Sequence, residues 1–325
     1  MAYSRGHVPP SLVADLRERV RDQRVVVVAG SGVTAGATRG HELSSWAGLV
    51  ASGVQWAAQL PGVQAGRLDA ARSLLSVGDS SSLIAAAELV TESLGGREGG
   101  EYARWLRETV GSMNVEDSAV LEALIALGVP VATTNYDGLI EQASGWERLT
   151  WLDGAAMQRA LQGDEEAVVH LHGHWRVARS VILGIRSYEE LAVSGPAQGL
   201  QRAMGTMNSL LFVGVGDGAS DPNFLALRMW LAATLPGSEY RHYRLCLSKE
   251  IGALSREHGP DERILPLGYG ESHEELAGFL ARLGAAPARG MERRVALGAP
   301  QRPCCRRDRS RSAEMTRLRS WLRGC

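Results

Sequence analysis

Two patterns of apolar residues alternate along most of the chain. Short continuous apolar runs are typical of strands that are buried on both faces of a parallel sheet. Such runs predict seven strands, at residues 25–29, 129–137, 167–173, 179–184, 209–216, 243–248 and 263–269. Apolar residues at helical spacing predict helices at 11–22 and 43–60, through most of 66–127, and between most of the later strands.

Strands that alternate with helices predict an α/β fold, a Rossmann-like parallel sheet flanked by helices. The long helical stretch contains no strand-like run. We therefore expect residues 41–127 to form a helical insertion after the first strand, within one domain of residues 1–285. Ligands of open parallel sheets bind at the carboxyl ends of the strands. The residues that follow each strand are the first candidates for chemistry.

Composition and charge narrow the class of protein. Apolar residues make up 45% of the 325 residues, and the formal net charge is -1, which indicates a globular fold. No apolar run has the length of a membrane span, and the N-terminal residues lack the apolar core of a secretory signal. We therefore expect a soluble cytoplasmic protein with no membrane contact. The four cysteines lack the spacing of a disulfide framework or a zinc ribbon.

Residues 286–325 differ in charge from the rest of the chain. They contain 11 Arg and three acidic residues, a balance of +8. We expect a basic, disordered C-terminal tail, which is either a dispensable extension or docks on the acidic body. Nucleic acid is expected to bind only through this tail, by counterion release.

A glycine-rich turn follows the first predicted strand, with Gly30, Ser31, Gly32 and Thr34. Backbone amides in such a turn can cradle phosphate, and glycine lets a ligand approach closely. A plain tight turn is the alternative interpretation. The turn lacks the lysine of a P-loop, and no acidic residue closes a second strand about twenty residues on. A P-loop NTPase and an NAD-dependent dehydrogenase are therefore both disfavoured.

Polar residues also end the next strands. Asn135 and Asp137, two residues apart, offer an amide and a carboxylate, or alternatively form an Asx-type turn that caps the next helix. In a strand, His170, His172 and His174 would share one face. A His-x-His pair can bind metal, but no further ligand cluster accompanies it, so we expect no metal. A histidine at a strand end suits general acid/base work.

A second glycine-rich segment, Gly214 to Gly218, follows the apolar run LLFV of the predicted strand at 209–216. It leads into Asp221 and Pro222, which are suited to the N-cap and the first position of a helix. Helix capping accounts for Asp221 but leaves the concentration of glycines at a second strand end unexplained.

The order of these motifs resembles the SIR2-like family, in its prokaryotic antiviral-defence branch. VVVVAGSGVTAG is similar to the family's first glycine motif, and Ser44 to Val50 to its S-W-x-x-L-L segment. TTNYD resembles T-x-N-x-D, LHG at 171–173 matches the segment of the catalytic histidine, and GVGDGASDPNF is similar to the second glycine motif. The resemblance covers roughly residues 10–284. The P-D-F-R segment and the zinc-binding cysteine pairs of deacetylating sirtuins are absent, which argues against protein deacylation.

The resemblance implies that NAD is the substrate and that particular residues hold it. His172 is the implied general base, Asn135 positions the ribose or a water molecule, and Asp137 holds the nicotinamide carboxamide. The implied NAD-binding residues lie in the two glycine motifs and next to Asn135; they are Gly30, Ser31, Gly32, Thr34, Thr134, Gly214, Gly216, Asp217 and Asp221.

With water as the acceptor, the implied enzyme is an NAD glycohydrolase (NADase) that releases nicotinamide and ADP-ribose. The branch implies an NAD-depleting effector of antiphage defence by abortive infection, gated by homo-oligomerisation or by a separate sensor or partner protein. A protein deacylase or ADP-ribosyltransferase is one alternative. A sensor that binds NAD or ADP-ribose without turnover is another.

Overall fold

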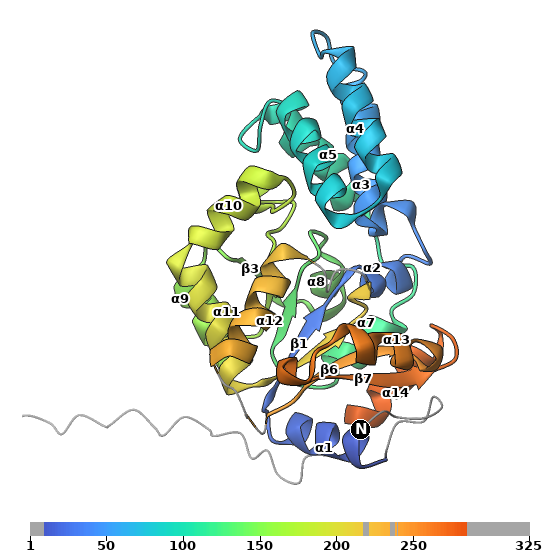
Figure 1. Cartoon of the computed structure of the whole chain (residues 1–325), viewed down its shortest axis with the longest axis vertical. Helices are drawn as coiled ribbons and strands as arrows, with labels where there is room; N and C mark the ends of the chain where they lie inside the picture. Colours follow the sequence, from blue (N-terminus) through green and yellow to red (C-terminus); the bar gives the residue numbers. More distant parts are fainter. Residues whose placement is uncertain (1–9, 217–220, 235–237, 239, 285–325) are drawn as a thin grey trace, which may run out of the picture. The chain divides into compact units, whose positions relative to one another are not determined.

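Seven parallel strands form the centre of the structure, a computed structural model that describes residues 10–216, 221–234, 238 and 240–284. The strands are β1 (Val25–Ala29), β2 (Val131–Thr133), β3 (Glu147–Thr150), β4 (Ala167–His170), β5 (Ser209–Val213), β6 (His242–Leu247) and β7 (Ile264–Gly270). Their order is β3-β4-β2-β1-β5-β6-β7, so the strand order reverses between β1 and β5 (Figure 1). A crevice at such a reversal is the usual ligand site of an open α/β sheet.

The predicted α/β fold with a parallel sheet is confirmed, with two differences among the strands. Residues 179–184 form no strand, because their backbone bonds to a loop: the Ile182 amide donates to the His172 carbonyl oxygen at 2.8 Å. The sequence analysis missed β3, an edge strand beside β4. Its residues Glu147 and Arg148 are exposed, so it lacks the apolar run of a buried strand.

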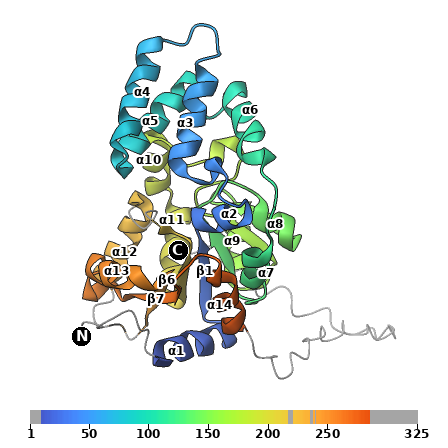
Figure 2. The same ribbon diagram turned by 90° about the vertical axis from the view of Figure 1, so that its right-hand side faces the viewer.

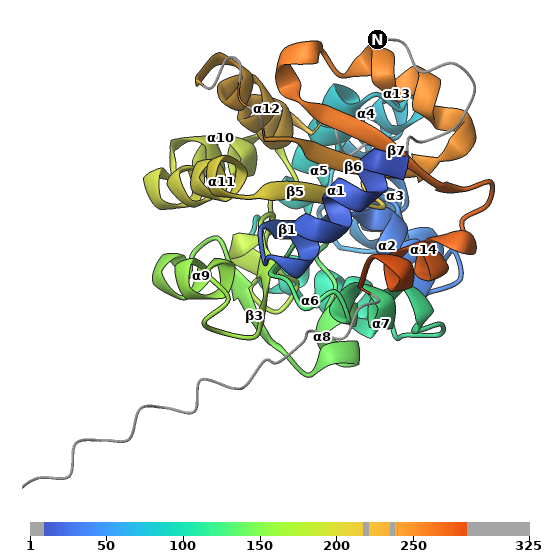
Figure 3. The same cartoon turned by 90° about the horizontal axis from the view of Figure 1, so that it is seen from below.

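Both faces of the sheet are buried, as the continuous apolar runs predict. In β1, Val25 and Val27 belong to one core cluster, and Val26 and Val28 to the other. The first face is covered by α1 (Pro10–Arg21), α7 (Ala119–Ile125) and α14 (Glu275–Gly284) (Figure 3). The second face is covered by α9 (Gly154–Leu161), α10 (Ile185–Val193), α11 (Gly195–Met207) and α12 (Pro222–Thr234). The remaining helices outside the β1–β2 connection are α8 (Leu139–Ser144) and α13 (Ile251–Glu257).

A helical region lies between β1 and β2, as predicted. Before α7 it contains α2 (Ser31–Ala37), α3 (Trp46–Ala57), α4 (Ala65–Val77), α5 (Ser80–Ser93) and α6 (Gly100–Glu108), with short 3-10 turns η1 (Glu42–Ser44) and η2 (Val110–Ser112). Figures 1 and 2 place α3, α4 and α5 beyond the end of the sheet at which β1 leads into α2. This region therefore lies over the edge of the sheet at which the strands end and the predicted motifs begin.

Within the described residues, none of the helices has the length and apolar character that a membrane crossing requires. The predicted basic tail at 286–325 lies outside the described residues. Cys246 is the one cysteine inside them, where it is free and buried, and burial raises the pKa of its thiol to about 12.

Candidate functional site

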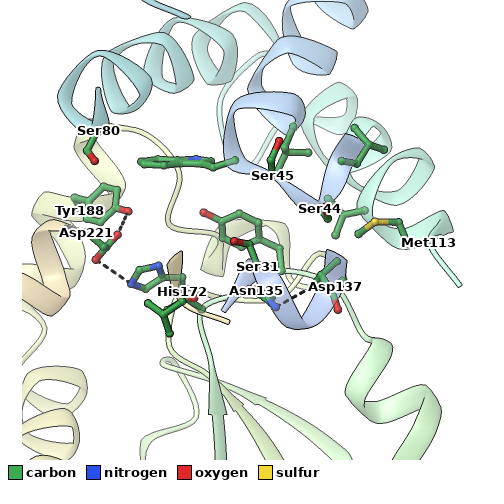
Figure 4. A pocket seen from close by; sticks show the side chains of 18 residues that line it. Ser31, Ser44, Ser45, Ser80, Met113, Asn135, Asp137, His172, Tyr188 and Asp221 are labelled. Carbon is green, nitrogen blue, oxygen red and sulfur yellow. Dashed lines mark hydrogen bonds and ion pairs between the residues drawn. The ribbon is translucent and has the colours of Figure 1, made fainter. Parts of the chain in front are cut away.

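An open cavity of about 750 Å³ lies between the carboxyl edge of the sheet and the helical region (Figure 4). The sheet side contributes polar groups from the strand ends, and the helical side contributes mainly apolar groups from η1, α3 and η2. The residues that line the cavity include Ser31, Thr34, Trp46, Leu49, Met113, Thr134, Asn135, Asp137, His172, Tyr188 and Asp221.

The two glycine motifs pack against each other at the reversal of strand order. A Cβ atom on Gly30 would lie 2.6 Å from the Cα of Val215, and one on Gly32 would lie 2.8 Å from the Cα of Gly214. The amides of Gly30 and Gly32 already donate to the carbonyl oxygens of Val213 and Gly214, at 2.9 and 2.7 Å. These two glycines therefore shape the pocket floor, and Ser31 and Thr34 are the members of the first motif that line the cavity.

Thr34, Asn135 and Asp137 form a hydrogen-bonded network on one side of the pocket. The Thr34 hydroxyl donates to Oδ2 of Asp137 at 2.6 Å, and Nδ2 of Asn135 donates to Thr34 Oγ1 at 2.8 Å and to the Gly30 carbonyl at 2.9 Å. Burial raises the pKa of Asp137, against the hydrogen bonds from Thr34 and from the Leu139 amide. The Leu139 bond is the predicted Asx-type turn, but the N-cap position of α8 is Gly138 and not Asp137, which lines the cavity.

The three histidines do not share one face, contrary to the expectation from strand alternation. β4 ends at His170, and the chain then turns through Gly173 at φ +85°, where a Cβ would lie 2.1 Å from the Ser180 carbonyl oxygen. The turn sends His172 into the pocket, while the rings of His170 and His174 pack edge to face, with centroids 4.7 Å apart. Of the three, only His172 lines the cavity.

His172 faces an acidic group that belongs to the second glycine motif. Its Nε2 lies 3.5 Å from Oδ1 of Asp221, and the hydroxyl of Tyr188 donates to the other oxygen of Asp221. Asp221 also accepts from the amides of Asn223 and Phe224, which confirms it as the N-cap of α12. Burial, followed by the charge of Asp221, raises the pKa of Tyr188 well above its usual value, so its hydroxyl stays a donor. Figure 4 shows the second ring nitrogen of His172 on the pocket side.

One buried polar atom of the lining lacks any polar partner among the described residues: the indole nitrogen of Trp46. Nε2 of His172 makes no hydrogen bond either, but it faces Oδ1 of Asp221 at 3.5 Å. Buried polar atoms are usually satisfied, so the unpartnered indole nitrogen in the cavity wall indicates that a polar ligand or water completes the site. Carboxylate, amide and hydroxyl groups on one side and Trp46, Leu49 and Met113 on the other fit a ligand with a polar and an aromatic part.

The other predicted binding residues lie nearby, with one exception. Thr134 lines the cavity, and its amide donates to the Ala29 carbonyl at 3.1 Å. Gly214 adopts a positive φ of 63° at the contact with the first motif. The Gly216 carbonyl accepts from the Arg244 guanidinium at 2.5 Å, which ties the second motif to β6. Asp217 lies outside the described residues.

The sequence analysis missed a buried cluster beside the pocket. Glu141, His170 and His174 bring potential metal-ligand atoms within 4.8 Å of one another. The expectation of no metal rested on the lack of a further ligand near the histidines in the sequence, and Glu141 supplies that group from α8. Tyr188 was missed for a similar reason: nothing in its helical sequence indicates that it meets Asp221 across the fold.

A protein-family model matches the part of the chain that carries several of these residues. Residues 130–278 match the family model of the SIR2-like domain. The matched segment contains Asn135, Asp137, His172 and Asp221, whereas the first glycine motif and Trp46 precede it. This match suggests NAD-related activity.

Proposed function

We propose that this protein is an NAD glycohydrolase, which cleaves NAD with water to nicotinamide and ADP-ribose. One observation carries the proposal: Asn135, Asp137 and His172, from two different strand ends, converge with Ser31 and Thr34 on a single cavity. The SIR2-like match over residues 130–278 supports NAD as the substrate.

The reaction breaks the bond between nicotinamide and ribose, and positive charge develops on the ribose as the bond lengthens. An enzyme accelerates this step by binding the transition state more tightly than the substrate. Asp137, with its Oδ2 held by Thr34, accepts hydrogen bonds from the carboxamide and places negative charge near the developing cation. Both Nδ2 contacts of Asn135 go to protein atoms, so its Oδ1 is the atom that orients a ribose hydroxyl or the attacking water.

His172 is the proposed general base. Its pocket-side nitrogen takes a proton from water or from a ribose hydroxyl, and the ring becomes an imidazolium. The carboxylate of Asp221, 3.5 Å from Nε2, stabilises that charge and orients the ring, much as a buried aspartate does in a catalytic triad. In this proposal Asp221 acts through His172, whereas the resemblance assigned it to NAD binding.

The proposed biological role is depletion of NAD in antiphage defence. It rests on the resemblance of the motifs and on the absence from the sequence of the cysteine pairs that build the zinc module of deacetylating sirtuins. In this role the activity is gated by self-assembly or by a partner protein.

The test is to incubate NAD with the purified chain and to follow nicotinamide and ADP-ribose by chromatography. We expect His172→Ala to lower the rate by about 10² to 10⁴, the usual contribution of a general base. His273→Ala is the matched control, because His273 is exposed and does not line the cavity. His170 and His174 are unsuitable controls, because both are buried. A His172→Ala rate close to that of the parent would remove His172 from the mechanism.

A further inference from the structure

Three side chains with metal-ligating atoms meet below the pocket, and none of them lines it. Glu141 comes from α8, His170 from the end of β4, and His174 from the loop that follows. Oε1 of Glu141 lies 2.6 Å from Nε2 of His170 and 3.9 Å from Nε2 of His174. The side chains are 14%, 1% and 2% exposed, so the three groups meet away from bulk solvent.

The tautomer of His170 leaves a lone pair that faces the cluster. Its Nδ1 lies 2.9 Å from the Asn135 carbonyl oxygen, which can only accept, so Nδ1 carries a proton. In the neutral ring, Nε2 is then an acceptor, and it faces a carboxylate oxygen that is also an acceptor. A positive species, either a proton or a metal ion, must lie between them. The other oxygen of Glu141, Oε2, is buried without a hydrogen-bond partner among the described residues.

His174 is the third potential ligand. Its Nδ1 accepts from the Arg176 amide at 3.1 Å, which places the ring proton on Nε2. Ligation through Nε2 moves that proton to Nδ1 and breaks the Arg176 bond. A typical hydrogen bond contributes far less free energy than the binding of a structural zinc ion does.

We propose that Glu141, His170 and His174 bind one divalent transition-metal ion of the zinc type. Two imidazole nitrogens and one carboxylate oxygen suit zinc, whereas calcium and magnesium prefer all-oxygen sites. Tetrahedral bonds of about 2.0 to 2.2 Å place ligand atoms roughly 3.3 Å apart. The distances of 2.6 and 3.9 Å from Oε1 of Glu141 lie on either side of this value, so a small movement of the carboxylate from His170 toward His174 brings both of them close to it. Water takes the fourth position.

Metal-bound histidines usually donate a hydrogen bond from their second ring nitrogen, which fixes the orientation of the ring. The hydrogen bond from Nδ1 of His170 to the Asn135 carbonyl is a contact of this kind. A metal here links α8 to the end of β4 and, through this bond, to the strand end that carries Asn135. The site is separate from the cavity, so zinc binding is measured without any assumption about NAD cleavage.

The experiment uses the full chain with zinc chloride, by titration calorimetry and by elemental analysis after gel filtration. We expect one zinc ion per chain, a higher Tm with zinc, and reversal of that rise by a chelator. Glu141→Gln and His174→Gln should each weaken zinc binding by at least about 100-fold, more than outer contacts contribute. The matched control, His273→Gln, replaces an exposed histidine outside the cluster and should bind zinc as the parent does.

Cobalt(II) on the parent chain gives a readout that does not depend on how the variants fold. We expect visible absorption of a four-coordinate nitrogen and oxygen site, without the near-ultraviolet band of thiolate ligation. The chain also contains Cys304, Cys305 and Cys325, which could bind zinc independently. A thiolate band, zinc binding retained in both variants, or no binding by the parent at micromolar zinc would each overturn the proposal.

Discussion

The side chain of Asp221 has two roles. It caps α12 through the amides of Asn223 and Phe224, and it faces His172 while it accepts from Tyr188. The sequence motif predicted the cap, because an aspartate directly before a proline is a familiar helix start. The contact with His172 joins residues 49 positions apart in the sequence, and no local pattern reports it.

Asp221→Asn separates the helix-capping role from the role of the negative charge beside His172. The amide oxygen can still accept from the capping amides, but the negative charge beside His172 is lost. We expect kcat for NAD cleavage to fall about 10- to 100-fold, or about 1.4 to 2.7 kcal/mol, with a small change in KM. Tyr188→Phe keeps the carboxylate and should have a smaller effect on kcat. Steady-state kinetics, with Tm measured alongside, checks this; a fall in Tm with unchanged kcat would leave Asp221 a purely structural role.

His242 makes folding stability sensitive to acid. Burial, followed by the charge of Arg19, lowers its pKa from 6.5 to about 4, and its Nδ1 accepts from the Leu210 amide at 3.0 Å. Between pH 6.5 and 4 the unfolded state therefore binds more protons than the folded state. The contribution of His242 to the free energy of unfolding is complete above pH 6.5. It declines as the pH falls toward 4, by at most about 3 kcal/mol.

His242→Asn tests this pH dependence, because the asparagine oxygen can replace Nδ1 as the acceptor but does not titrate. Urea unfolding at pH 7.5 and at pH 5 should show a smaller loss of stability on acidification in the variant than in the parent. Equal losses in the two proteins would assign the acid sensitivity to other groups.

At the scale of elements, the turn after β4 decides which histidine reaches the pocket. Gly173 has φ +85° and no room for a Cβ, which would lie 2.1 Å from the Ser180 carbonyl oxygen. Gly163 has a similar φ of +81° but open space around it. The two glycines therefore separate backbone strain from steric overlap.

Gly173→Ala should lower the free energy of unfolding by at least about 2 kcal/mol, from the strain of a positive φ and from overpacking. Gly163→Ala should lower the free energy of unfolding by only about 1 kcal/mol, because it adds the strain of a positive φ without steric overlap. Denaturant unfolding of both variants measures the difference. Equal losses would mean that the loop at Ser180 yields to the added methyl group.

The elements also show how far the sequence predicts the fold. Continuous apolar runs predicted β1, β2, β4, β5, β6 and β7, because burial on both faces leaves that pattern in the residues themselves. Residues 180–184 of the run at 179–184 are buried as well, but this run packs as a loop against the His172 turn. Edge strand β3 is short and half exposed, and its pairing with β4 leaves no local pattern.

At the scale of the whole molecule, a parallel sheet with its reversal between β1 and β5 gathers distant motifs at one edge. This explains why the sequence could predict a shared site from Thr34, Asn135 and His172, which all line the cavity. It could not predict the Glu141 cluster, because α8 and the end of β4 meet only in the folded chain.

The most direct test is to incubate the full chain with NAD in water enriched in oxygen-18. We expect nicotinamide and ADP-ribose in equal amounts, with one heavy oxygen in the ribose of the product, and loss of both products in His172→Ala. NAD that binds without turnover at any protein concentration would point to a sensor or to a missing partner protein. Release of nicotinamide without an equal amount of labelled ADP-ribose would contradict hydrolysis, because the ADP-ribose would then have gone to an acceptor other than water.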